Sequence, residues 1–481
     1  MAPSKVDTIS FDTFSNVING QLRSSKTKYQ GIDPTTKQPN WDVPVATLED
    51  IEDAVAAANK AFAEWKNTTW EYRVERLARL KEAFEVYQEE FTNLLLKETG
   101  KPRGIGAYEV QACSAYIDWH MKLKEPKGET EDLPTRTVVH KFVPLGVAAA
   151  ICPWNFPLVL SLGKVLPAVL MGNAVIVKPS PFTPYTALKM AEVANQVFPP
   201  GLVQALGGDD KLGPALVEHP DIHKISFTGS IATGKKVMAG AAKTVKRVTL
   251  EMGGNDPSIV LPDANIAKVA PMVAMGAFMN TAQVCIAVKR IYVHSSMYDE
   301  FLAALVTATK NLKVGNSNDE GVMLGPVQNG MQYEKVKTFF KDTKEHGYKF
   351  ALGSGDVPDN QGFFIQPTIV DNPPDDSMIV KEEPFGPIVP VQKYDDLDEV
   401  IQRANKFKVG LGATIFGTDP KKLQEVADKL DAGSVWINTP PGSGPEAQFG
   451  GVKESGIGTE FGTLGILAYA NVKAITTAKD V

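Results

Sequence analysis

From Gly146 onwards, short apolar runs alternate with longer helical stretches. Strands are expected at residues 147–152, 174–178, 202–206 and 224–228, and helices at 156–171, 183–197 and 212–218. Strands and helices that repeat at intervals of about 20 to 30 residues indicate βαβ units, which build a parallel sheet. Ligands of such sheets bind beyond the carboxyl ends of the strands. Functional side chains are therefore expected in the loops that follow these strands.

The length and charge of the chain narrow its class. Its 481 residues exceed what one core supports, so two or three domains are expected at about 150 residues each. The net charge of −6, without a stripe of Lys and Arg, argues against a nucleic-acid partner. No apolar run reaches the roughly 20 residues that span a bilayer, and the first residues resemble neither a signal nor a transit peptide. We expect a cytoplasmic protein without a membrane partner.

Two amphipathic helices are expected near the N-terminus. Thr47 and Asp50 resemble a capping box that opens the first. The second is expected from about residue 71 to Gly100, with Pro102 just beyond it. Apolar residues recur in both at helical spacing, so we interpret them as scaffold.

The cysteines and histidines indicate no metal. Cys113, Cys152 and Cys285 form neither an even framework nor a CxxC pair, which fits free thiols in a reducing compartment. The six histidines make no HExxH pair. No metal site is predicted.

Cys285 and Glu251 are the candidate reactive pair. A thiolate can attack an electrophilic carbon, and a carboxylate can activate the water that later releases the product. Each has a simpler interpretation alone, as a buried inert cysteine and as a strand end before Gly253 and Gly254. Together they predict covalent chemistry on a carbonyl carbon.

The segment 227–236 is a candidate phosphate loop. Gly229, Ser230 and Gly234 follow an expected strand and open a helix, whose N–H groups can receive a phosphate. The spacing also approaches that of a P-loop, but Lys236 stands where a Mg²⁺-binding Ser or Thr is needed. A P-loop NTPase is therefore a disfavoured alternative.

Six segments, in order along the chain, resemble motifs of the aldehyde dehydrogenase superfamily. They are Pro153-Trp154-Asn155-Phe156-Pro157, Val177-Lys178-Pro179-Ser180, Phe227-Thr228-Gly229-Ser230 with Gly234, Leu250-Glu251-Met252-Gly253-Gly254, Gln283-Val284-Cys285 and Lys381-Glu382-Glu383-Pro384-Phe385-Gly386-Pro387. The resemblance extends from about residue 18 to near the C-terminus.

The resemblance implies an α/β architecture of three parts. These are a Rossmann-like dinucleotide-binding domain (1–115 and 143–250, with a return over 433–467), an α/β catalytic domain (251–432) and a small β oligomerisation arm (116–142 and 468–481). The alternating tail 472–477 is typical of an edge strand, which requires a partner. A homodimer or homotetramer is expected.

The resemblance also implies NAD(P)⁺-dependent oxidation of an aldehyde to a carboxylic acid. Cys285 would form a thiohemiacetal and then a thioester, and Glu251 would activate the water that hydrolyses it. Asn155 and the backbone N–H of Cys285 would hold the oxyanion. The simpler interpretation of Asn155 is a cap of the helix that follows it. A family-like binding subunit without activity is the remaining alternative.

The resemblance assigns cofactor contacts to eight residues: Trp154, Lys178, Ser180, Gly229, Ser230, Gly234, Glu383 and Phe385. Lys178 would bond the adenosine ribose, the glycines and Ser230 would face the phosphates, and Glu383 would hold the nicotinamide ribose. Pro181 stands where many NAD⁺-preferring members carry a glutamate. NAD⁺ is the expected cofactor, with NADP⁺ left open.

Four residues are expected to line the aldehyde tunnel: Phe156, Leu160, Gly163 and Phe449. Gly163 stands where the family often has a bulky aromatic residue, which predicts a wide tunnel. The lining is apolar, without an arginine for a charged group. The expected substrate is an uncharged aliphatic or aromatic aldehyde, with room for a bulky one.

Overall fold

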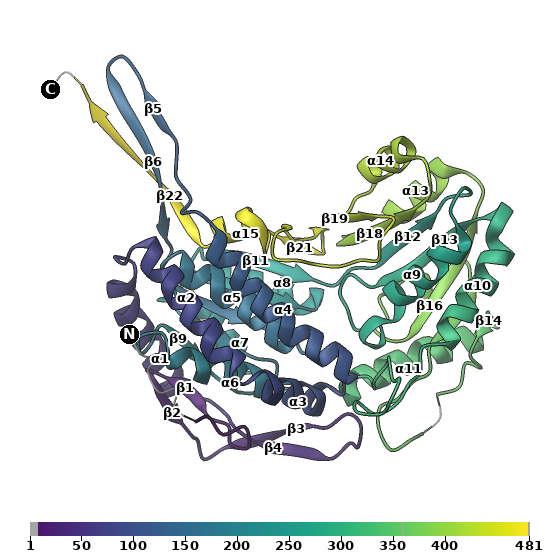
Figure 1. Ribbon diagram of the computed structural model, residues 1–481, viewed down its shortest axis with the longest axis horizontal. Helices are drawn as coiled ribbons and strands as arrows, with labels where there is room; N and C mark the ends of the chain where they lie inside the picture. The colour runs from purple at the N-terminus through teal and green to yellow at the C-terminus, as the bar shows by residue number, and fades with distance from the viewer. Residues whose placement is uncertain (1–7, 358, 480–481) are drawn as a thin grey trace.

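The computed structural model describes residues 8–357 and 359–479. Figure 1 shows two α/β lobes and an arm of long strands that projects from the first lobe. The central sheet of the first lobe has the order β2 (Gln21–Arg23), β1 (Asn16–Ile18), β9 (Val203–Ala205), β8 (Ala174–Lys178), β7 (Val147–Ile151), β10 (Lys224–Gly229), β11 (Arg247–Met252) and β21 (Gly456–Ile457).

The five strands from β9 to β11 are parallel and confirm the expected parallel sheet. Numbered along the chain from β7, their spatial order is 3-2-1-4-5, the doubly wound arrangement. The order reverses between β7 and β10, where such folds bind their ligands. The helices of this lobe are α1 (Leu48–Trp65), α2 (Trp70–Glu85), α3 (Gln88–Thr99), α4 (Arg103–Lys122), α5 (Pro157–Leu170), α6 (Tyr185–Asn195), α7 (Leu212–Glu218) and α8 (Ile231–Ala242).

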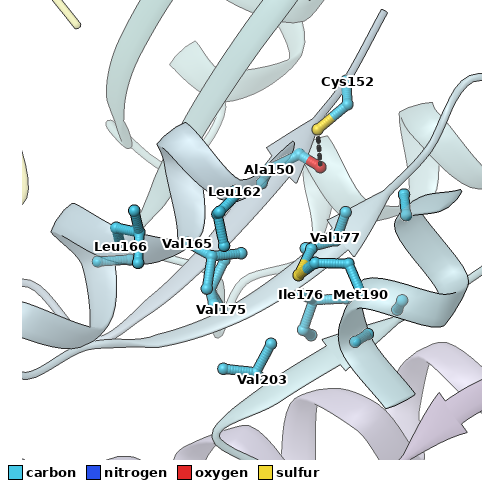
Figure 2. Close-up of a cluster of buried hydrophobic side chains, with 14 of the residues drawn as sticks. Ala150, Cys152, Leu162, Val165, Leu166, Val175, Ile176, Val177, Met190 and Val203 are labelled. Carbon is cyan, nitrogen blue, oxygen red and sulfur yellow. Dashed lines mark hydrogen bonds between the residues drawn. The ribbon is translucent and has the colours of Figure 1, made fainter. Parts of the chain in front are cut away.

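The core of the first lobe lies between this sheet and its helices. Figure 2 shows α5 side chains such as Leu162 and Val165 beside Val175 and Val177 of β8. Apolar residues fill both faces of β7 and β8, as buried parallel strands require. This packing fixes the ends of β7 and α5, from which site residues project.

The second lobe contains another largely parallel sheet. Its order is β14 (Lys349–Leu352), β15 (Thr368–Asp371), β16 (Ile388–Tyr394), β13 (Val288–His294), β12 (Asp256–Val260), β18 (Gly412–Phe416) and β19 (Ser434–Ile437). The helical segments here are α9 (Ile266–Phe278), η1 (Met279–Ala282), η2 (Ser295–Met297), α10 (Tyr298–Lys310), α11 (Gly330–Glu345), α12 (Met378–Lys381), α13 (Leu397–Asn405) and α14 (Pro420–Lys429).

The arm is a three-stranded antiparallel sheet of β22 (Ala470–Ala478), β6 (Arg136–Pro144) and β5 (Thr130–Asp132). β22 pairs with β6 along its whole length and forms an edge, as the tail pattern predicted. Short α15 (Gly462–Leu467) precedes it. Two small ribbons complete the chain, β3 (Lys28–Ile32) with β4 (Pro39–Pro44) and β17 (Val409–Gly410) with β20 (Val452–Lys453).

The N-terminal helices differ from expectation in one respect. The capping box of Thr47 and Asp50 is formed, and Gly100 ends α3 in the left-handed region at φ 71°. The expected helix from 71 to 100, however, is two helices separated at Val86 and Tyr87. Residues 116–122, which we assigned to the arm, form the last turns of α4. The domain boundaries stay a prediction.

In residues 8–357 and 359–479, no helix combines the length and apolar character needed to cross a bilayer. Over the same ranges, no group of three or more His, Cys, Asp and Glu side chains is arranged to hold a metal ion.

Candidate active site

A pocket opens where the strand order reverses. Its walls come from the loop after β7, the end of β10 with the start of α8, the end of β11, and the second lobe. The lining residues are Pro153, Trp154, Asn155, Thr228, Gly229, Ser230, Glu251, Met252, Gly253, Cys285, Met331, Gln332, Lys335, Glu383 and Phe385. The pocket thus brings the three expected catalytic residues together with five of the eight expected cofactor residues.

Cys285 lies at the end of a strained loop. Asn280, Thr281 and Ala282 have φ values of 52°, 57° and 61°, which residues with side chains seldom adopt. Hydrogen bonds hold the loop, because Thr281 Oγ1 donates to Gly325 O at 2.9 Å and Gln283 Nε2 donates to Asn280 O at 3.0 Å. These hydrogen bonds therefore hold the backbone that positions the Cys285 thiol.

Asn155 follows β7 and is buried. Its Nδ2 donates to Gln283 O at 2.9 Å, which joins the first lobe to the loop that carries Cys285. The first helical residue after it is Pro157, and no side chain caps α5. The simpler interpretation as a helix cap therefore does not describe this side chain. Its second N–H remains available to an oxygen in the pocket.

Glu251 lies on β11 beside Thr228 of β10, and its side chain lines the same pocket as Cys285, close enough for each to shift the pKa of the other. Burial raises the pKa of Glu251 to about 8. Burial also raises the pKa of Cys285 well above its usual value, and the adjacent Glu251 raises it further. A thiol that must lose a proton thus lies against a carboxylate able to accept it near neutral pH.

A buried charged network lies beneath Glu251. Lys164 of α5 pairs with Glu460 and donates to Thr228 Oγ1 at 2.8 Å. Ser226 Oγ donates to Glu460 Oε1 at 2.9 Å. The negative charge of Glu460 raises the pKa of Glu251, whereas Lys164 lowers it. Lys164, Ser226 and Glu460 were not singled out in the sequence analysis, because the motifs that we recognised include only Thr228 of this network.

The rest of the pocket suits a cofactor. Ser230 caps α8 through a bond from Thr233 N, so the helix N-terminus faces the pocket with its positive end. Trp154 and Phe385 meet edge to face with ring centroids 5.3 Å apart. A Cβ on Gly253 would lie 2.3 Å from Glu383 Oε2, so only a glycine at this position leaves room for the Glu383 carboxylate.

Gly234 lies inside α8, one turn beyond the pocket. A Cβ there would lie 2.1 Å from the sulfur of Met252, so the glycine lets the helix pack closely on β11. Gly234 is therefore needed for the packing of α8 on β11, and it does not line the pocket itself.

Lys178 lies at a second pocket lined by residues of α7 and α8, together with Asp210, Glu218 and Lys236. Its Nζ donates to Pro179 O at 3.1 Å. Ser180, in contrast, is buried, and its Oγ accepts a hydrogen bond from Phe182 N at 3.3 Å. It lines neither of the two pockets. Six of the eight expected cofactor residues therefore line two pockets, and Gly234 and Ser180 lie outside both.

At Gly163, where a wide tunnel was expected, the structure has an aromatic side chain in the space beside the glycine. A Cβ on Gly163 would lie 2.9 Å from Cε1 of Phe461, so the Phe461 ring occupies the space that the glycine leaves. The same ring packs edge to face on Tyr116 at 5.0 Å and against Phe449 at 6.0 Å. Phe461 itself has φ 57° and ψ 178°, a conformation that favours glycine.

The other two expected tunnel residues lie at the start of the same helix. Phe156 precedes α5, and the Lys101 ammonium lies 3.8 Å from its ring centroid. Leu160, one turn further, is partly buried against the main core. Neither lines the pocket that contains Cys285, and the lining of the aldehyde tunnel stays a prediction.

We expect Phe461→Leu to shift substrate size. Shortening the ring opens space beside Gly163, so the ratio of kcat/KM for phenylacetaldehyde to that for acetaldehyde should rise about tenfold. The loss of stability should stay near 1 kcal/mol, because Leu retains much of the apolar volume. Steady-state kinetics and thermal unfolding measure both. Phe84→Leu, at a buried site stacked on Phe91, is the control, and an equal shift there would contradict the assignment.

Comparison with known proteins decides the family. The model of the Aldehyde dehydrogenase family matches residues 22–475. The chain belongs to this family. As a member of the aldehyde dehydrogenase family, it oxidises an aldehyde to the acid. The P-loop NTPase alternative is therefore set aside.

The aldehyde dehydrogenase relatives are similar over nearly their full length. The putative aldehyde dehydrogenase FUS7 of Gibberella fujikuroi is 45% identical, covering 97% of this chain and 99% of the relative. A chloroplastic betaine aldehyde dehydrogenase of Atriplex hortensis is 36% identical, covering 96% and 95%. The crystal structure of betaine aldehyde dehydrogenase from Staphylococcus aureus in complex with NAD⁺ has a TM-score of 0.93 at 33% identity, covering 96% and 94% of the chains. These matches confirm the expected fold class.

Proposed function

We propose that the protein is a hydrolytic, NAD⁺-dependent aldehyde dehydrogenase in which Cys285 is the nucleophile. The observation that carries the proposal is the convergence of Cys285, Glu251 and Asn155 on one pocket, although they come from three separate parts of the chain. Such a set of nucleophile, base and oxyanion donor is what acyl chemistry requires.

The first step is attack on the aldehyde carbon. The Cys285 sulfur forms a bond to that carbon, and its proton passes to the Glu251 carboxylate, which lines the same pocket. The carbonyl oxygen becomes an oxyanion, stabilised by the free N–H of Asn155 and the backbone N–H of Cys285. Fixed donors stabilise this charge more than mobile water does, because they need no reorganisation.

The later step is hydrolysis of the thioester on Cys285. Glu251 must again be ionised, because it takes a proton from the attacking water. The carbon–sulfur bond then breaks, Cys285 leaves as thiolate, and the carboxylic acid is released. The pKa of Glu251 near 8 keeps this carboxylate a stronger base than an exposed glutamate.

The residues of the two pockets suit a dinucleotide. Glu383 would hold the nicotinamide ribose, Ser230 and the N-terminus of α8 the phosphates, and Lys178 the adenosine ribose. When bound, the nicotinamide supplies the acceptor of the hydride. The NAD⁺ complex of the Staphylococcus aureus relative supports NAD⁺ as first choice. The acidic side chain of Asp210 near Lys178 also opposes a 2′-phosphate, a role that Pro181 cannot perform.

We propose an uncharged aliphatic or aromatic aldehyde as substrate. The aromatic cluster of Tyr116, Phe449 and Phe461 beside Gly163 supports an apolar group at this wall. A cationic aldehyde is the second candidate. The names of the betaine aldehyde dehydrogenase relatives favour it, and aromatic faces attract cations.

The experiment that tests the function is cofactor reduction with a panel of aldehydes. Acetaldehyde, hexanal, benzaldehyde, phenylacetaldehyde and betaine aldehyde are each supplied with NAD⁺ and with NADP⁺, and the absorbance of the reduced cofactor is followed. We expect the largest kcat/KM with NAD⁺ and an uncharged aldehyde. Preference for betaine aldehyde would replace that substrate class by the cationic one. Absence of reduction with every pair would favour the binding-subunit alternative.

We also propose that the arm joins subunits into a homodimer or homotetramer. β22 is an edge strand, and Val472 and Ile475 on it are exposed to 62% and 38%. An exposed apolar edge is a liability unless another strand or surface covers it. A second copy of the chain is the partner that the family resemblance implies.

A further inference from the structure

Lys289 is a buried lysine directly behind the catalytic cysteine. It retains 3% of its exposure and lies four residues after Cys285, at the start of β13. Its Nζ donates to Cys285 O and, at 3.3 Å, to Ala287 O. An ammonium so deeply buried is costly unless it is paired with opposite charge.

Two carboxylates supply that charge. Glu383 Oε1 lies 3.0 Å from Lys289 Nζ, and the buried Asp256, which forms no ion pair with Lys289, acts on the same ammonium through its charge alone. Burial lowers the pKa of Lys289, but Glu383 and Asp256 outweigh it, so the pKa is raised above its usual value. Lys289 therefore carries its charge and links the Glu383 side chain to the catalytic loop.

The backbone explains how Lys289 reaches them. β12 and β13 pair Asp256 with Val288 and then Pro257 with Arg290, so Lys289 is the unpaired residue of a β-bulge. A bulge redirects a side chain relative to the regular alternation of the strand. Here the bulge lies at Lys289, whose ammonium pairs with Glu383, a residue of the pocket lining.

We propose that Lys289 is a positioning residue that holds Glu383 for the cofactor ribose and anchors it to the loop carrying Cys285. The proposal rests on the proposed function, in which Glu383 binds the nicotinamide ribose. A single ammonium then links the cofactor carboxylate to the catalytic loop, because it contacts both the Glu383 carboxylate and the backbone carbonyl of Cys285. Lys289 acts through these groups and has no contact with the aldehyde in this scheme.

The test is a double-mutant cycle on the dissociation constant of NAD⁺, measured by calorimetry with Lys289→Met, Glu383→Gln and the double variant. We expect Lys289→Met to raise Kd about tenfold in the native background and less than about twofold beside Glu383→Gln, since coupled partners are not additive. Lys289→Arg should restore most of the affinity, because the guanidinium can still pair with Glu383.

The control is Lys189→Met. Lys189 is equally buried and pairs with Glu192 at 2.5 Å on α6, away from both pockets. It should lower thermal stability without changing Kd. If Lys289→Met raised the Kd of NAD⁺ by the same factor in both backgrounds, the proposal about Lys289 would be wrong, whereas the proposed function would stand. An unchanged Kd in Glu383→Gln would overturn the cofactor role of Glu383 and the proposal with it. If Lys289→Met does not fold, Lys289→Gln takes its place in the cycle, and equal factors for Lys289→Gln in both backgrounds overturn the proposal in the same way.

Discussion

Cys285→Ala is expected to abolish aldehyde oxidation, with kcat lowered by about 10⁴-fold or more. The sulfur forms the bond on which every later step depends, and alanine offers no nucleophile. Stopped-flow and steady-state measurement of the reduced cofactor check this. NAD⁺ should still bind with nearly native affinity, because the thiol makes none of the proposed cofactor contacts.

The matched control is Cys113→Ala. Cys113 is a buried cysteine on α4, and burial raises the pKa of its thiol well above the usual value, as it does for Cys285. It lies outside the pocket lining, so most of the activity should remain. If Cys285→Ala kept its rate, the assignment of the nucleophile would be wrong.

Glu251→Gln is expected to stop the reaction after one turnover. A first equivalent of reduced cofactor should still appear per active site, but more slowly than in the native enzyme, because Cys285 also loses the carboxylate that accepts its proton; the following steady-state rate should be about 10² to 10⁴-fold lower. Glutamine keeps the shape of the side chain but cannot take the proton from water. Quenched-flow measurement of the burst and of the trapped thioester on Cys285 distinguishes this from general loss of activity.

The pH profile gives an independent check on Glu251. Its pKa of about 8 means that the carboxylate fraction rises as pH rises through this value. Where hydrolysis limits turnover, kcat should therefore increase with pH and level off above about 8 in the native enzyme. Glu251→Gln should lose this rise. A profile that falls over the same range, or a variant with no burst, would contradict the role of Glu251 as base.

The fold could be predicted where sequence signals are local. The strands of the first sheet are short apolar runs set off by polar, Gly- and Pro-containing segments, and their prediction is confirmed within about one residue. The break between α2 and α3 was missed because Val86 and Tyr87 interrupt neither the apolar spacing nor the helical propensity.

The site shows the same division. The segments around Cys285 and Glu251 are short motifs, so they could be recognised one at a time, and folding brings them together. Phe461 lies far from Gly163 in the chain, so nothing near Gly163 indicates that a ring fills the space. Lys289 depends on a strand register that one sequence does not contain. Contacts between distant segments were therefore the part that sequence reasoning could not supply.

Helix α5 connects several of these features. Asn155 precedes its first turn, Gly163 forms its aromatic contact in the middle, and the next residue, Lys164, belongs to the network beneath Glu251. A change that makes room for a larger aldehyde at Gly163 thus acts on helix α5. The same helix follows Asn155, the oxyanion donor, and carries Lys164, whose charge lowers the pKa of Glu251. Substrate range and turnover cannot evolve independently here, and engineering for bulkier aldehydes is best begun at Phe461, which lies off this helix.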